Sequence, residues 1–228
     1  YCIAKINNNT MVLSNEGTVY AIQGYSPRPI STAAIENEIK IRDGSTAQAI
    51  CYTDAGHFYY QLSIDANGPD IPAITLVYDL STQLWHCRRD ETYGRHRANC
   101  YMKAFNKHLV GDFASGKIYE MSTTFYDNAG DPLVAQIDSG PVLTGGQQVG
   151  MACIEIECDV GNGNAACPNP VAGLEISRDD GKTYGNQRLA SLGQVGKGMR
   201  RVKWWKNGSA IAPRFRFKIS DPVPRQIV

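Results

Sequence analysis

The sequence lacks a long apolar run, a charge surplus and a starting Met. No stretch of about 18 apolar residues is present, so we expect no membrane span, and the beginning of the chain has no basic-then-apolar signal pattern. Lys and Arg number 23 against 22 Asp and Glu, a balance that does not favour a protein whose main task is to neutralise phosphates. The chain begins Tyr1-Cys2-Ile3-Ala4, which suggests a fragment or a processed chain.

Motifs of catalysis and metal binding are also missing. There is no Gly-x-Ser-x-Gly elbow, no P-loop and no dinucleotide-binding glycine spacing. We therefore predict no catalytic residue, no cofactor and no enzymatic activity. The histidines and cysteines do not have the close spacing of zinc ligands, and we predict no metal site. The residues considered for it are His86, Cys87, His96, Cys100 and His108.

The seven cysteines are odd in number and widely spread. Small secreted domains instead use paired cysteines in a tight framework. We interpret the cysteines as reduced thiols of a protein that matures in a reducing cytoplasm. A secreted protein with one unpaired thiol is the alternative. The residues are Cys2, Cys51, Cys87, Cys100, Cys153, Cys158 and Cys167.

Short alternating apolar runs, separated by turn residues, predict an all-β fold. Hairpins are expected over 11–22 and 47–64, and one short helix over 31–39. Residues 76–85 resemble residues 109–118: each segment is a strand, an Asp, a turn of small polar residues and a second strand. The repeat favours propeller-like antiparallel hairpins. Two unrelated hairpins with common turn chemistry are the alternative.

The turn-rich stretch 126–132 predicts a domain boundary. We expect a partial propeller-like β-hairpin region over 1–126 and a β-sandwich-like domain over 127–228. Strict alternation of polar and apolar residues, as in 214–219, is typical of strands that bury one face. Strands of the second domain are expected at 133–137, 149–160, 171–177, 198–205 and 214–219.

The basic and aromatic stretch 197–206 is the strongest candidate for an interaction surface. On a strand, Arg201, Lys203 and Trp205 would share one face, while Arg200 and Lys206 would share the other with two apolar residues. Such a strand suits a protein interface, a nucleic-acid contact or an ordinary sandwich strand with a solvated basic face. The candidate contact residues are Arg200, Arg201, Lys203, Trp205 and Lys206.

Residues 177–184 resemble the Asp-box of sialidase-type propellers, in which five side chains lock a hairpin turn. The motif is informative about the turn and says little about function. A retaining glycosidase needs two carboxylates in a cleft, and no such pair stands out. We predict a structural role for Ser177, Asp179, Gly181, Thr183 and Tyr184.

Several segments occur in the same order in the packaged-DNA stabilisation proteins, or tail hub proteins, of short-tailed bacteriophages. They are 30–36, 76–79 leading to Trp85, 174–201 and 220–224. The chain resembles the C-terminal half of a family member.

The resemblance implies a non-enzymatic virion protein of the tail, assembled in the bacterial host cytoplasm. Family members form a sixfold ring below the portal and its adaptor, close the DNA exit channel, and help to hold the tail needle and tailspikes. Non-specific contact with packaged DNA is compatible with this role. The alternatives are a carbohydrate-binding or glycosidase-like propeller protein and a nucleic-acid-binding module.

Overall fold

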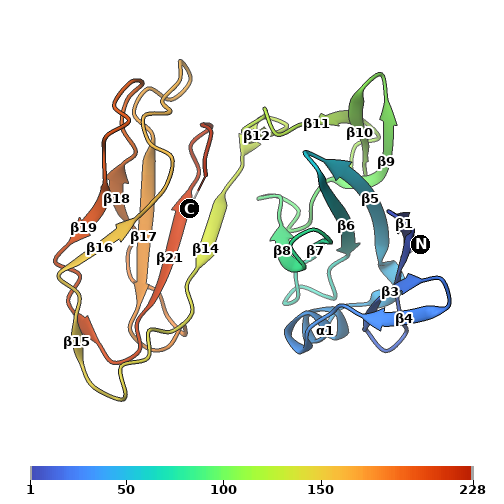
Figure 1. The fold of residues 1–228 in the computed structure, drawn as a ribbon, viewed down its shortest axis with the longest axis horizontal. Helices are drawn as coiled ribbons and strands as arrows, with labels where there is room; N and C mark the ends of the chain where they lie inside the picture. The colour runs from blue at the N-terminus through green and yellow to red at the C-terminus, as the bar shows by residue number, and fades with distance from the viewer. Residues whose placement is uncertain (1, 227–228) are drawn as a thin grey trace. The chain divides into compact units, whose positions relative to one another are not determined.

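The computed structural model describes residues 2–226; Tyr1, Ile227 and Val228, at the outer ends of the two expected domains, lie outside the described residues. The chain divides into two compact units, Tyr1–Ser122 and Thr123–Val228. The turn-rich stretch 126–132 lies just after this division. Both units are built mainly of β-strands (Figure 1).

Three antiparallel sheets, each formed by strands that are consecutive in sequence, build the first unit. Two sheets have the strand orders β1-β2-β3-β4 and β5-β6-β7-β8, and the third is β11-β10-β9. Such up-and-down sheets are the repeating element of propeller folds. The strands are β1 Ile3–Ile6, β2 Asn9–Leu13, β3 Val19–Gln23, β4 Ser26–Pro29, β5 Gln48–Asp54, β6 His57–Ile64, β7 Ile74–Asp79, β8 Leu84–Arg88, β9 Ala98–Ala104, β10 Lys107–Asp112 and β11 Ile118–Met121.

The two turns expected from the internal repeat are built alike. The Asp79 carboxylate accepts hydrogen bonds from the backbone N–H of Ser81 (2.8 Å) and the hydroxyl of Thr82 (3.0 Å). In the same way Asp112 accepts from the backbone N–H of Ala114 (3.2 Å) and from the hydroxyl of Ser115. Burial alone would raise the pKa of both carboxyls. The hydrogen bonds to each carboxylate have the larger combined effect, so the pKa of each lies below its usual value. Both hairpins therefore use one local turn design, as predicted.

The α-helix α1 (Ala33–Lys40) and a 3-10 turn at Gly44–Thr46 are the helical elements among the described residues of the first unit. Thr32 caps α1, since its side chain accepts from the N–H of Ile35. Ile39 of the helix is buried in a core that also contains Met11, Tyr60 and Leu62. No helix among residues 2–226 is long and apolar enough to cross a membrane.

The second unit is a β-sandwich. Its larger sheet has the order β14-β21-β17-β18, and the pairs β16-β19 and β15-β20 lie opposite. Leu174, Val202 and Trp204 are buried in the core between these layers, and a small hairpin, β12-β13, precedes them. The strands are β12 Asp127–Asn128, β13 Asp131–Pro132, β14 Ala135–Asp138, β15 Val149–Gly150, β16 Cys153–Ile156, β17 Val171–Ser177, β18 Arg188–Ser191, β19 Val202–Trp205, β20 Ser209–Ala210 and β21 Arg214–Ile219.

The predicted all-β class, with antiparallel hairpins followed by a β-sandwich, is confirmed. The propeller-like arrangement of the hairpins stays a prediction. Two predicted strands are wrong in extent. The expected strand 149–160 is divided into β15 and β16, because Met151 and Ala152 bond the turn at 206–208 instead of a strand. The expected strand 198–205 is ordered as a strand only from Val202.

Candidate interaction surface

Strand β19 places its apolar side chains inward. Val202 and Trp204 are 1% and 3% exposed, while Lys203 lies on the opposite face directly across from Glu155 of β16. Lys203 Nζ lies 3.1 Å from a Glu155 carboxylate oxygen and Arg201 Nη1 lies 3.6 Å from the other. One carboxylate thus balances part of the basic face expected from the sequence.

Three of the five predicted contact residues, Arg200, Arg201 and Lys206, lie outside β19. Arg200 precedes the strand and is exposed. Lys206 follows it with a φ of 59°, in the left-handed region that ends extended structure. Their expected alternation with Val202 and Trp204 is therefore wrong. Trp205, in contrast, remains on the outer face, is 59% exposed, and lies with its ring centroid 6.0 Å from Lys203 Nζ.

The Asp-box segment forms a closed turn after β17. The Asp179 carboxylate accepts from the hydroxyls of Ser177 (2.7 Å) and Thr183 (2.6 Å) and from the Thr183 N–H (2.9 Å). These hydrogen bonds, led by the Thr183 hydroxyl, lower the pKa of Asp179. Gly181, with a φ of 89°, donates its N–H to the Ser177 hydroxyl. The polar atoms of the turn are thus directed at one another.

Two arginines of strand β21 contact residues of this turn. The guanidinium carbon of Arg216 lies 3.7 Å from the Tyr184 ring centroid, a cation–π contact. Arg214 pairs with Asp180 at 2.9 Å. Asp179 and Asp180 therefore both have structural partners, which argues against a catalytic pair of carboxylates here.

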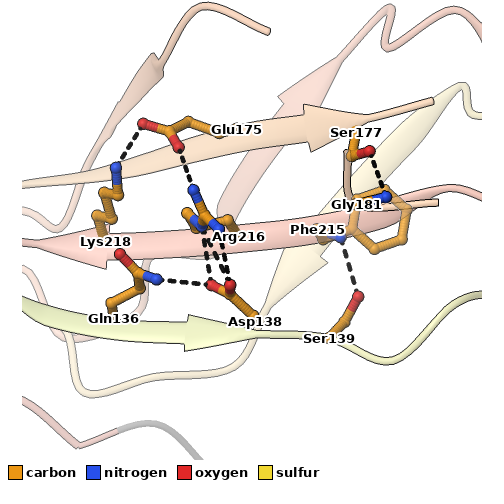
Figure 2. A network of polar contacts seen from close by, with 9 residues as sticks. All are labelled: Gln136, Asp138, Ser139, Glu175, Ser177, Gly181, Phe215, Arg216 and Lys218. Carbon is orange, nitrogen blue, oxygen red and sulfur yellow. Dashed lines mark hydrogen bonds and ion pairs between the residues drawn. The ribbon is translucent and has the colours of Figure 1, made fainter. Parts of the chain in front are cut away.

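Figure 2 shows the charge network around Arg216 on the outer face of the larger sheet. Arg216 donates to both oxygens of Asp138 on β14, and its Nη1 lies 3.7 Å from Glu175 on β17. Lys218 pairs with the same Glu175 at 2.8 Å. These ion pairs connect the neighbouring strands β14, β21 and β17, so the charged side chains on this face pair with one another across the sheet.

A row of aromatic rings in the first unit is the feature that sequence reasoning missed. The ring centroids are 5.9 Å apart for His57 and Tyr59, 5.0 Å for Tyr59 and Tyr52, 5.7 Å for Tyr52 and Tyr101, and 5.8 Å for Tyr101 and His108. The row joins β5 and β6 to β9 and β10. The alternation of side chains along the β5–β6 hairpin places Tyr52 and Tyr59 on one face. The contact of Tyr52 with Tyr101 of β9 is tertiary and could not be predicted from this alternation.

Each end of this row has an acidic neighbour. His57 Nδ1 lies 2.7 Å from Asp79, and His108 Nε2 lies 4.0 Å from Asp54. A cavity of about 380 Å³ nearby has one aromatic lining residue and no carboxylate. It is lined by Gln48, Ala49, Ile50, Asn99, Cys100 and Tyr101.

The cysteines and histidines do not converge. All seven cysteines are free thiols, and burial raises the pKa of the Cys51 thiol to about 12, which keeps it protonated. Within the described residues, no group of three His, Cys, Asp or Glu side chains is arranged to hold a metal ion.

The architecture of the second unit is that of a β-sandwich protein with internally paired surface charges. Residues 138–228, all within this unit, match the family described as "Bacteriophage P22 Gp10, beta-sandwich". The match supports the resemblance to a short-tailed phage tail-hub family and favours a structural protein over an enzyme. No curated protein sequence matches the chain.

Two solved structures have weak similarity over 99% of the chain. One is titled "Glycoside hydrolase", with 11% identity, 68% of its own length covered and a TM-score of 0.27. The other is a glycoside hydrolase family 43 arabinoxylan arabinofuranohydrolase from Bacillus subtilis in complex with cellotetraose, with 10% identity, 67% covered and a TM-score of 0.25. These TM-scores are too low to support an inference about fold or activity.

Proposed function

We propose that this chain is a structural subunit of a short-tailed phage tail machine, in a ring below the portal and adaptor that closes the DNA exit channel. The observation that carries the proposal is the match of residues 138–228 to the phage P22 β-sandwich family. The subunit acts in the virion tail, after assembly in the host cytoplasm, and contacts copies of itself, the portal–adaptor assembly, the tail needle and the tailspikes. Six copies would complete the ring.

The surface chemistry is consistent with a subunit that works by burying interfaces. Residues 139–154 contain no charged side chain, yet Val142, Leu143 and Val149 are exposed there. Ile211 is also exposed, and its backbone C=O accepts from the Thr144 hydroxyl, so the two segments lie together. Uncharged surface with exposed apolar side chains is suited to contact with another protein. We call Val142, Leu143, Val149 and Ile211 the apolar tip.

The proposal is tested by native mass measurement of the full chain, alone and mixed with a purified portal–adaptor assembly. We expect stoichiometric docking of a defined number of copies. Leu143→Asp should weaken docking, whereas Leu189→Asp, which changes another exposed leucine outside the tip, should not. A chain that remains folded and never associates with the assembly would rule the proposal out.

Carbohydrate binding is the second candidate, and the ring row His57–Tyr59–Tyr52–Tyr101–His108 is the observation that favours it. Aromatic faces with nearby carboxylates are common in sugar sites, but the cavity beside this row has no carboxylate lining. Calorimetric titration with bacterial surface glycans separates the two candidates. Binding that is lost in Tyr59→Ala and retained in Leu143→Asp would favour the carbohydrate-binding alternative.

A further inference from the structure

Charge is unevenly distributed along the second unit. Residues 123–180 contain nine acidic side chains and one basic side chain, Arg178, whereas residues 181–220 contain ten basic side chains and no acidic one. The fold brings the two segments together, and five of the ten basic residues form ion pairs. The paired residues are Arg201, Lys203, Arg214, Arg216 and Lys218.

Two arginines without an acidic partner converge on the turn after β19. Arg178 donates to the backbone C=O of Asn207 at 3.0 Å, and Arg188 donates to the Asn207 side-chain oxygen at 2.5 Å and to the Trp205 C=O at 2.6 Å. Their acceptors are all neutral. Within residues 2–226, neither guanidinium forms an ion pair, and both side chains are exposed.

Asn207 organises this arrangement. Its side chain is 1% exposed and donates to the Trp204 C=O at 2.7 Å, while its backbone N–H donates to the Met151 C=O. Gly208 follows with a φ of 78°, and a Cβ there would lie 2.9 Å from Arg178 Nη2. The positive φ favours glycine here, and a side chain at this position would require the Arg178 guanidinium to move.

Lys206 lies in the chain between Trp205 and Asn207, whose oxygens accept from the two arginines, and it adds a third basic side chain to this turn. It is exposed and without an ion pair among the described residues, and the neighbouring Trp205 indole is 59% exposed. The two guanidinium groups that meet at Asn207 repel each other without a paired carboxylate, and an anion relieves that repulsion. Guanidinium groups form forked hydrogen bonds with phosphate oxygens, and an exposed indole stacks on bases. We call Arg178, Arg188 and Lys206 the cationic cluster.

We propose that the cationic cluster and Trp205 form a site for the phosphodiester backbone of a nucleic acid. Assembly into a structural ring does not require such a site, so the inference goes beyond the proposed function. It also relocates the expected contact: Arg201 and Lys203 share Glu155, whereas the cluster has no carboxylate partner. An acidic protein segment would satisfy the charges but would leave the indole without a stacking partner.

Fluorescence anisotropy of the full chain with labelled DNA of about 20 nucleotides tests the site. We expect binding at about 50 mM salt that weakens about tenfold by 200 mM for two phosphate contacts. Arg178→Gln with Arg188→Gln should weaken binding at least tenfold and lower the salt slope by about 1.5. Arg214→Gln with Lys218→Gln removes the same net charge, from residues that pair with Asp180 and Glu175, and should weaken binding several-fold less.

Further variants guard against misfolding and identify the ligand. Lys206→Gln changes an exposed side chain without an ion pair among the described residues and should still weaken binding several-fold, with an unchanged circular dichroism spectrum. Trp205→Ala should weaken binding of single strands more than binding of a matched duplex, because only unpaired bases can stack. The site is overturned by absence of binding at low salt, or by equal losses in the two charge-matched double variants. Equal affinity for polyglutamate would overturn the nucleic-acid assignment.

Discussion

Arg216 and Tyr184 join β21, an inner strand of the larger sandwich sheet, to the Asp-box turn. The guanidinium carbon lies 3.7 Å from the Tyr184 ring centroid while the same group donates to both oxygens of Asp138. One side chain thus links the turn after β17, the strand β21 and the edge strand β14. The Asp-box is part of the sandwich's own framework.

Arg216→Ala should destabilise the second unit by about 2 kcal/mol, because the cation–π contact and the forked pair with Asp138 are lost together. Arg214→Ala is the matched control. It removes one exposed pair with Asp180 and should cost about 0.5 kcal/mol. Urea unfolding of the full chain, followed by tryptophan fluorescence, measures both. If both variants lowered the free energy of unfolding equally, the contacts of Arg216 with Tyr184 and Asp138 would not stabilise the unit more than an exposed ion pair does.

Asp179→Asn should lower the unfolding temperature, since asparagine cannot accept every hydrogen bond that the two carboxylate oxygens accept from Ser177 and Thr183. The pKa of Asp179 is lower in the folded chain than the usual value of 3.8. Its contribution to stability is therefore present above pH 3.8 and is lost as the pH falls through the folded pKa.

The difference in unfolding temperature between the unsubstituted chain and Asp179→Asn should accordingly shrink below pH 3.8. Asp180→Asn is the control, because Asp180 has a left-handed φ of 61° that asparagine tolerates. At neutral pH, Asp180→Asn should lower the unfolding temperature less than Asp179→Asn does. Calorimetric scans across the acid range would test the idea, and a constant difference at every pH would refute it.

Turn chemistry made parts of this fold predictable from sequence. The matching turns at Asp79 and Asp112 depend on hydrogen bonds to residues two and three positions later. The Asp-box is local in the same sense. Such contacts are set by spacing along the chain, so the sequence alone contains the information.

Tertiary partners were beyond sequence reasoning. Nothing in residues 197–206 reveals that Glu155 lies opposite Lys203, because the register of β16 against β19 is fixed by packing. Strand β18 was missed because its four residues are too few for a clear alternation. The cationic cluster likewise depends on Arg178 and Arg188 meeting at Asn207, a contact between three separate segments.

The stability of the first unit should fall between pH 6.5 and 4, and His96 should account for much of this. Burial, with Arg88 nearby, lowers the pKa of His96 to about 4. Its Nδ1 also accepts from the Ala98 N–H at 3.2 Å and contacts the Gln61 amide at 3.3 Å. The unfolded chain takes up a proton near pH 6.5 while the folded chain does not, so acid favours unfolding in this range.

Titration of His96 should change the free energy of unfolding by up to about 1.4 kcal/mol per pH unit in this range. His96→Asn should reduce the pH dependence of unfolding, even if the variant is less stable at neutral pH. Urea midpoints at several pH values for the two proteins give the comparison. Parallel curves for the two proteins between pH 6.5 and 4 would show that His96 does not titrate as expected.

The two matching turns both have a left-handed residue at the same corresponding position, but its identity differs, and exchange of these residues gives a matched pair of variants. Gln83 has a φ of 60° where the second turn has Gly116 with a φ of 64°. A residue with a side chain in this region costs about 1 kcal/mol relative to glycine. Gln83→Gly should therefore stabilise the first unit by up to about 1 kcal/mol, and Gly116→Gln should destabilise it by a similar amount. Urea unfolding gives both free energies, and effects of the same sign would show that the turns are not equivalent.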